Sequence, residues 1–148
     1  MLRWLLASFH LLALGIGLGA IWVRALALDG APEASRVRRA LRADTWWGIA
    51  ALLWLATGLA RLLMGTEKPT AYYLANHLFW LKMGLFLFVV MLEVGPAVSL
   101  AGWRTALRKS QTPNTYLAHR WATFSRLEVG LVLCILFIAT AMARGYGS

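Results

Sequence analysis

The sequence predicts an all-α integral membrane protein, folded as a single four-helix bundle over residues 1–148. Of its 148 residues, 60% are hydrophobic and only 14% are charged, which is too apolar for a soluble domain of this size. The apolar residues gather in four stretches, and a helix that crosses a bilayer needs about 20 such residues. Because lipid offers the backbone no hydrogen bonds, these stretches are expected to be helical. The lipid bilayer is therefore the expected partner.

The first predicted span covers residues 4–28. A signal peptide is the competing interpretation, since Ala25-Leu26-Ala27 resembles a cleavage site, but the apolar run is too long for one. Seven-residue steps along this span place four residues on one helix face: Arg3, His10, Gly17 and Arg24. Polar side chains inside a bilayer cost free energy, so His10 and Arg24 require an explanation.

The second predicted span covers residues 46–64, and two tryptophans at its start are typical of a membrane interface. The segment before it, residues 29–44, predicts a turn followed by a separate basic helix at the interface.

The third predicted span, residues 77–100, carries Lys82 and Glu93 eleven residues apart and therefore on one helix stripe. Pro96 is expected to kink its end. The fourth span covers residues 127–143.

Basic residues in the connections predict the orientation. Four arginines lie in residues 29–44 and five basic residues connect the third and fourth spans, whereas the remaining connection and the termini hold few. Since basic loops stay cytoplasmic, we expect both termini outside a bacterial cytoplasmic (inner) membrane. This pattern and anionic lipid also account for the formal net charge of +9, so no nucleic-acid partner is expected.

With this orientation, the polar residues of the spans fall into two layers. His10 and Lys82 lie at matching depth, about 7–9 Å inside the outer boundary. Near the cytoplasmic side we expect an inner layer in which Arg24 pairs with Glu93. Such a layer ties helices together as an ion network, or it uses Arg24 and Glu93 as catalytic residues that handle protons or substrate carboxylates. Its other expected members are Arg126 and Glu128.

The outer layer is a candidate haem b site. A neutral imidazole ligates haem iron well, and a lysine held neutral by an apolar setting could supply the opposite ligand, so His10 and Lys82 are the candidate metal ligands. His77 competes with Lys82, but it lies about 140° away around the helix, at the interface. Arg3 and Arg61 are candidates for binding the propionates. A purely structural interpretation stays open, in which His10 hydrogen-bonds to a neighbouring helix and Lys82 reaches the interface.

Three stretches resemble HemJ-type protoporphyrinogen oxidases. The first span, with Phe9-His10-Leu11, the glycines between residues 15 and 19, Trp22 and Arg24, resembles their opening helix and, more loosely, the membrane domain of copper-resistance D proteins. Residues 80–85, Trp-Leu-Lys-Met-Gly-Leu, resemble a patch whose lysine is associated with haem b, and residues 124–129 resemble the start of the last helix. The whole chain resembles an uncharacterised family of small four-span bacterial membrane proteins related to HemJ.

This resemblance implies a haem b protein with a redox role, either a membrane oxidoreductase that oxidises a porphyrinogen or an electron carrier with a redox partner. Two other function classes stay open: a non-enzymatic transporter subunit or scaffold, and a copper-handling protein with His10 and Met83 as ligands. The lateral surface of four spans also leaves room for a homodimer.

Overall fold

The computed structural model describes residues 1–31, 33–65 and 68–147. In this described part the chain forms five helices in the order α1 (Leu2–Leu28), α2 (Ala34–Leu63), α3 (Thr70–Ala75), α4 (His77–Arg108) and α5 (Ala118–Ala143). All but the short α3 are long and apolar enough to cross a membrane. The predicted all-α, four-helix membrane fold is thereby confirmed.

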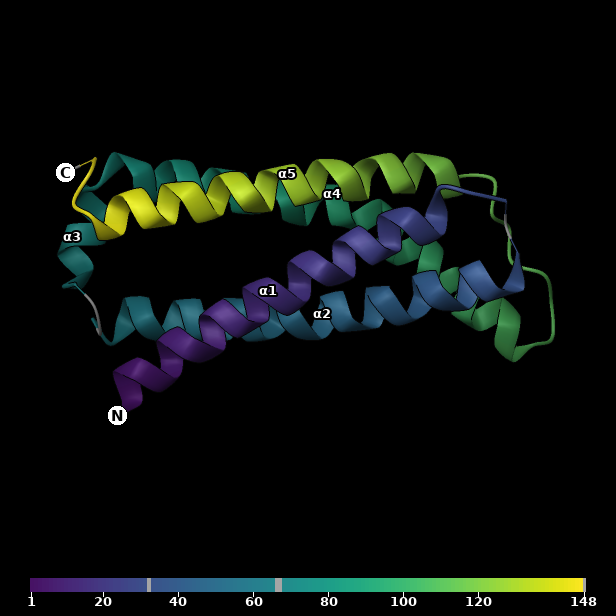
Figure 1. Ribbon diagram of the computed structural model, residues 1–148, viewed down its shortest axis with the longest axis horizontal. Coiled ribbons are helices and arrows are strands. Elements are labelled where there is room, and N and C mark those ends of the chain that lie inside the picture. The colour runs from purple at the N-terminus through teal and green to yellow at the C-terminus, as the bar shows by residue number, and fades with distance from the viewer. Residues whose placement is uncertain (32, 66–67, 148) are drawn as a thin grey trace.

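The long helices form two antiparallel pairs, α1 with α2 and α4 with α5 (Figure 1). Both chain termini and α3 lie at one end of the bundle, called here the terminal end, and the connections α1–α2 and α4–α5 form the opposite loop end (Figure 1). Helix α1 runs diagonally, beside α2 along its length and toward α5 at the loop end (Figure 1). The two pairs are therefore closest at the loop end.

Helix α2 differs from the prediction. In place of an interfacial helix within residues 29–44 and a separate span 46–64, one continuous helix begins at Ala34. Residues 34–47 contain no glycine or proline, so nothing in the chain interrupts the helix there. Arg36 in its first turn folds back on the end of α1, donating to Leu26 O at 2.7 Å and to Ala27 O at 3.3 Å. These bonds satisfy carbonyls that the end of a helix leaves free.

The third and fourth spans are also longer than predicted. Helix α4 continues through Pro96 to Arg108, because a proline removes one backbone hydrogen bond without preventing the turns beyond it. Helix α5 begins at Ala118, nine positions before the predicted residue 127. Ser125, which precedes the predicted span, and Glu128, at its start, therefore both lie well inside the helix.

The terminal end is closed by the buried side chain of Asn76. Its Oδ1 accepts from Leu78 N at 2.9 Å and caps α4, while its Nδ2 donates to Tyr146 O at 2.9 Å. The Tyr72 hydroxyl donates to Met142 O at 3.2 Å. These bonds join the connection before α4 to the end of the chain.

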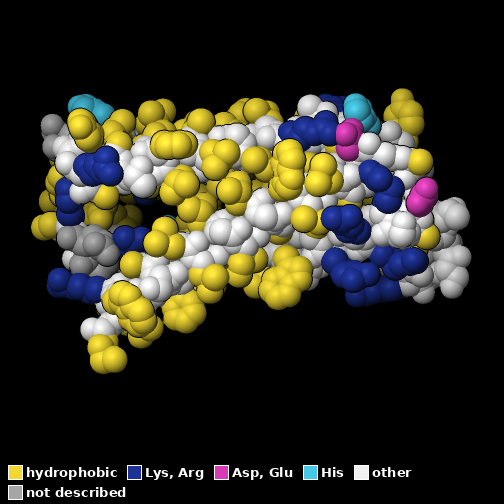
Figure 2. All heavy atoms as spheres, viewed as in Figure 1, with side chains coloured by type: hydrophobic (Ala, Val, Ile, Leu, Met, Phe, Trp, Pro, Cys, Tyr) yellow, Lys and Arg dark blue, Asp and Glu magenta, His cyan; other side chains and the backbone are white. Residues whose placement is uncertain are grey.

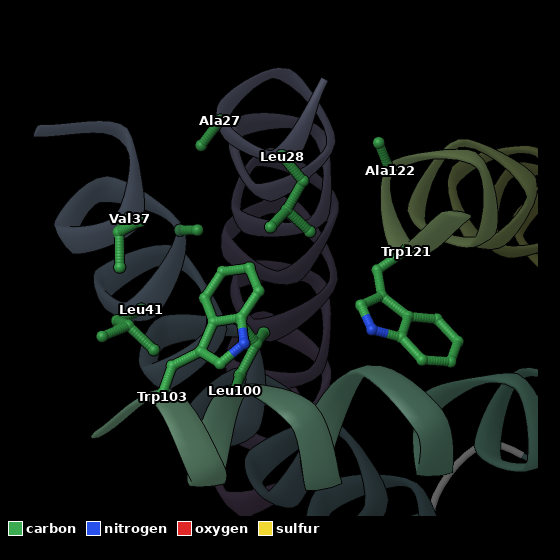
Figure 3. Close-up of a cluster of buried hydrophobic side chains, with 9 residues drawn as sticks. Ala27, Leu28, Val37, Leu41, Leu100, Trp103, Trp121 and Ala122 are labelled. Carbon is green, nitrogen blue, oxygen red and sulfur yellow. The ribbon is translucent and has the colours of Figure 1, made fainter. Parts of the chain in front are cut away.

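Two clusters of buried hydrophobic side chains hold the helices together. The loop-end cluster draws on all four long helices and places the indoles of Trp103 and Trp121 near Leu28 and Leu100 (Figure 3). Gly95 makes this packing fit, since a Cβ on it would lie 2.6 Å from Trp121 Cη2. The mid-bundle cluster contains Ala13, Ala20, Ile21, Trp47, Trp54, Val89, Val132 and Ile135.

Large hydrophobic side chains also cover the outside of the bundle along its length, while Lys and Arg gather toward its two ends (Figure 2). This distribution suits a bilayer, whose core takes apolar side chains and whose headgroup regions take basic ones. The chain is therefore a multi-pass membrane protein whose outer surface contacts lipid.

Candidate functional site

The side chain of Arg24 is fully buried in the loop-end half of the bundle. It makes five hydrogen bonds, which use all five N–H donors of a guanidinium. Nη1 and Nη2 donate to the two oxygens of Glu93 at 2.6 and 2.7 Å, so the predicted pairing of Arg24 with Glu93 is confirmed. Nη2 also donates to Glu128 Oε2 at 2.6 Å.

Three members of this ion network were not expected from the sequence: Asp44, Ser125 and Arg104. Arg24 Nη1 donates to Asp44 Oδ1 at 3.0 Å, and Arg24 Nε donates to Ser125 Oγ at 3.0 Å. Arg104 completes the network by donating to Asp44 Oδ2 at 2.6 Å. Asp44 lies in the segment predicted as a separate interfacial helix, so an inward role was not expected for it. In the continuous helix α2 it lies seven residues before Ala51, on the same helix face. The network thus joins all four long helices.

Arg126, predicted as a fourth member of the inner layer, is not part of this network. It lies on the opposite side of α5 from Glu128 and forms an ion pair with Asp29 just beyond α1. His119 Nδ1 lies 3.0 Å from the other oxygen of Asp29. The Arg126 guanidinium holds the pKa of the Asp29 carboxyl below its usual value. This exposed cluster ties the end of α1 to α5.

The buried network contains more acid than base. Two guanidinium groups, on Arg24 and Arg104, face the carboxylates of Asp44, Glu93 and Glu128. Glu128 Oε1 is buried and has no hydrogen-bond partner among the described residues. Since every donor of Arg24 is engaged, a substrate carboxylate could reach it only by displacing one of these groups. The catalytic roles of Arg24 and Glu93 stay predictions.

His10 lies in the terminal-end half of α1, against α2. Its Nδ1 is 2.9 Å from Thr57 Oγ1, and that oxygen lies 2.7 Å from Leu53 O. A hydroxyl carries one hydrogen, so we assign that hydrogen to Leu53 O and the imidazole hydrogen to Nδ1. With that assignment, the lone pair of the imidazole is on Nε2.

Two neighbours shape the surroundings of this imidazole. Gly58 leaves it space, because a Cβ there would lie 3.1 Å from His10 Cε1. Trp54 packs on the ring with centroids 5.8 Å apart, and its Nε1 is buried without an acceptor among the residues described. A buried N–H without a partner is rare in proteins. The site therefore combines the imidazole of His10 with an unused donor on the tryptophan that packs against it.

The other predicted site residues differ in their surroundings. Half-buried Arg61 and Lys82, from α2 and α4, lie within electrostatic reach of His10 and of each other. Lys82 Nζ is 5.1 Å from the centroid of Phe79 and has no ion pair with a described residue. Arg3 is exposed in the first turn of α1, two helical turns before His10, and His77 is exposed at the start of α4.

The space-filling view shows a hollow between α1 and the α4–α5 pair near the terminal end, with Lys or Arg atoms at its edge (Figure 2). The three residues His10, Arg61 and Lys82 come from three helices of this half of the bundle. Among the described residues, no three His, Cys, Asp or Glu side chains gather as a metal site. This half of the bundle therefore holds an imidazole that can ligate a metal, with the basic side chains of Arg61 and Lys82 around it.

These features define a class: polytopic membrane proteins of four helical spans, with a buried ion network at one end and a histidine-centred polar site at the other. The chain belongs to the family described as predicted membrane protein (DUF2214), whose profile matches residues 2–147. No curated protein and no solved structure shows significant similarity to it.

Proposed function

We propose that the protein binds haem b in the terminal-end half of the bundle, where His10 would ligate the iron, and that it has a redox role. The observation that carries this proposal is the hydrogen bond between His10 Nδ1 and Thr57 Oγ1. Histidines that ligate metals donate their other ring N–H to a fixed acceptor, which orients the ring and makes it more basic. With the hydroxyl hydrogen assigned to Leu53 O, which lies 2.7 Å away, Thr57 is such an acceptor.

The charges around His10 also suit haem b. Arg61 is a basic group at membrane depth within electrostatic reach of His10, and a haem propionate would place a negative charge beside it. Lys82, on the other helix pair from His10, would supply the second iron ligand as a neutral amine. Arg61 and the more distant Arg3 are the proposed propionate partners, and Trp54 Nε1, which has no acceptor in the described part of the chain, is a further donor.

The bound haem would supply one-electron chemistry that protein side chains lack. The role of the chain would be to orient it, to set its potential through the ligands and the apolar walls, and to exclude water. The redox role includes oxidation of a porphyrinogen, as in HemJ-type enzymes, and electron transfer to a partner. In the proposed setting, a bacterial inner membrane with both termini outside, this site lies in the outer leaflet.

The copper-handling alternative has less support, because Met83 is exposed on α4, one position from Lys82. The scaffold alternative is favoured by one observation, the complete use of the Arg24 donors, which suits a structural tie. That tie lies at the loop end and is compatible with haem at the terminal end. A homodimer through lateral surfaces would leave both sites intact.

Electron paramagnetic resonance of the ferric protein tests the proposed ligands. We expect a low-spin signal in the wild type, because two strong nitrogen ligands give a large ligand field. Lys82→Ala should convert it to high spin, and His10→Ala should abolish haem retention. His77→Ala is the matched control and should leave the signal unchanged. A wild-type preparation without any haem signal after haem supplementation would contradict the proposed function itself.

A further inference from the structure

A groove of about 560 Å³ lies between α1 and α2 in the loop-end half, and its lining includes no residue of the two sites described above. This volume falls within the range of ligand sites, about 300–1,000 Å³. Its α2 wall is one helical stripe with steps of four, three and four residues: Ser35, Arg39, Arg42 and Trp46. Its α1 wall is apolar and is formed by Ile16, Gly19, Ala20 and Val23.

The groove has a polar end and an apolar end. Helices α1 and α2 are antiparallel, and their register is set by the contact of Gly17 with Trp47 and by the ion pair of Arg24 with Asp44. In this register Arg39 and Arg42 lie toward the loop end, beyond Asp44, while Ile16 lies toward the middle of the bundle. The cations therefore lie at headgroup level and the apolar wall extends into the membrane.

Neither arginine has an acidic partner among the described residues, and both are exposed. Gly19 leaves open space, since no atom lies within 4 Å of a Cβ built on it. Trp46, 56% exposed at the groove, is the kind of side chain that sits at the headgroup boundary. The groove thus combines two guanidiniums that can bind a phosphate with a smooth wall that can take an acyl chain.

We propose that this groove binds an anionic phospholipid from the leaflet at the loop end. The phosphate lies between Arg39 and Arg42, with the Ser35 hydroxyl as a further donor, and one acyl chain follows the α1 wall past Gly19. Charge complementarity selects this occupant over a zwitterionic lipid, since the groove supplies two positive charges and no carboxylate among its lining residues.

Native mass spectrometry of the detergent-purified protein tests this proposal, with phosphatidylglycerol and phosphatidylcholine of the same acyl chains as probes. Phosphatidylglycerol should bind at least about tenfold more tightly. The double variant Arg39→Gln/Arg42→Gln should lose about 30-fold in affinity for it. Arg38→Gln/Arg108→Gln removes the same charge from exposed positions outside the groove and should stay within about twofold of the wild type.

A second pair of variants tests the acyl-chain wall without changing charge. Gly19→Leu fills the groove and should weaken phosphatidylglycerol binding, while Gly15→Leu, also in open space but outside the groove, should not. Equal binding of the two lipids, or equal losses in both arginine doubles, would overturn the proposal. Displacement of the lipid by inorganic phosphate, with no effect of Gly19→Leu, would show a phosphate site instead and would also overturn it.

Discussion

Arg24 and Glu93 form a bidentate ion pair, at 2.6 and 2.7 Å, between two helices whose backbones do not meet. None of the described residues of α1 comes within 8 Å, Cα to Cα, of one in α4. The guanidinium reaches across this separation and at the same time binds carboxylates on α2 and α5. One side chain therefore connects both helix pairs, and the geometry predicts that their assembly depends on it.

Arg24→Gln should destabilise the folded protein by about 3–5 kcal/mol, because it leaves three carboxylates buried without their shared cation. Arg24→Lys should recover part of the loss, since it restores the charge but not the fork that binds Glu93 through two parallel bonds. Thermal unfolding in detergent, followed by circular dichroism, measures both. A loss below about 1 kcal/mol in Arg24→Gln would contradict a central role for the network.

Glu128→Gln, in contrast, should change the free energy of unfolding by less than about 1 kcal/mol. The network has one more carboxylate than guanidinium, and Glu128 Oε1 has no partner among the described residues, so an amide removes the excess charge while still accepting from Arg24 Nη2. The same unfolding measurement applies. A loss as large as that of Arg24→Gln would show that the excess charge is required.

Gly95→Ala should destabilise the bundle by about 1–3 kcal/mol, because its Cβ would lie 2.6 Å from Trp121 Cη2 and the indole would have to move. Gly102→Ala, on the same helix, is the matched control, since no atom lies within 4 Å of its Cβ. Tryptophan fluorescence during unfolding reports both stability and the Trp121 environment. Equal midpoints for the two variants would contradict the close packing of α4 on α5.

The ion pair of Asp29 with Arg126 should make stability depend on pH in the acid range. The guanidinium lowers the pKa of Asp29 in the folded protein below its usual 3.8, so the stabilisation is fully present above that value. It is lost as the pH falls through the lower, folded-state pKa. Asp29→Asn should therefore unfold at a lower temperature than the wild type at pH 7, and the difference should disappear in strong acid. A difference independent of pH would contradict the pair.

Thr57→Val should weaken haem retention, because it removes the hydroxyl that orients His10 while keeping the shape of the side chain. Thr57→Ser keeps the hydroxyl and should retain haem. Removing the hydrogen-bond partner of a metal-ligating histidine typically lowers the affinity for the metal by about 10–100-fold. Titration of the apo-protein with haem measures this affinity. Equal affinities in the two variants would show that the Thr57 hydroxyl does not orient His10.

The sequence was sufficient to predict the four spans and the Arg24–Glu93 pair, because bilayer length, hydropathy and the cost of buried charge all act locally or pairwise. It did not predict that α2 runs without a break from Ala34, because the basic composition of residues 29–44 resembles an interfacial helix, although residues 34–47 contain no glycine or proline. Ser125, Asp44 and Thr57 were missed for a related reason. Their roles depend on which helix faces which, and hydropathy does not encode this.

The proposed function is tested most directly by the absorption spectrum of the protein purified from membranes of cells supplied with a haem precursor. We expect a Soret band that co-purifies with the wild type and with His77→Ala and is lost in His10→Ala, although that variant still folds and elutes as the wild type does. A wild-type spectrum without a Soret band, or a band of undiminished intensity in His10→Ala, would contradict it.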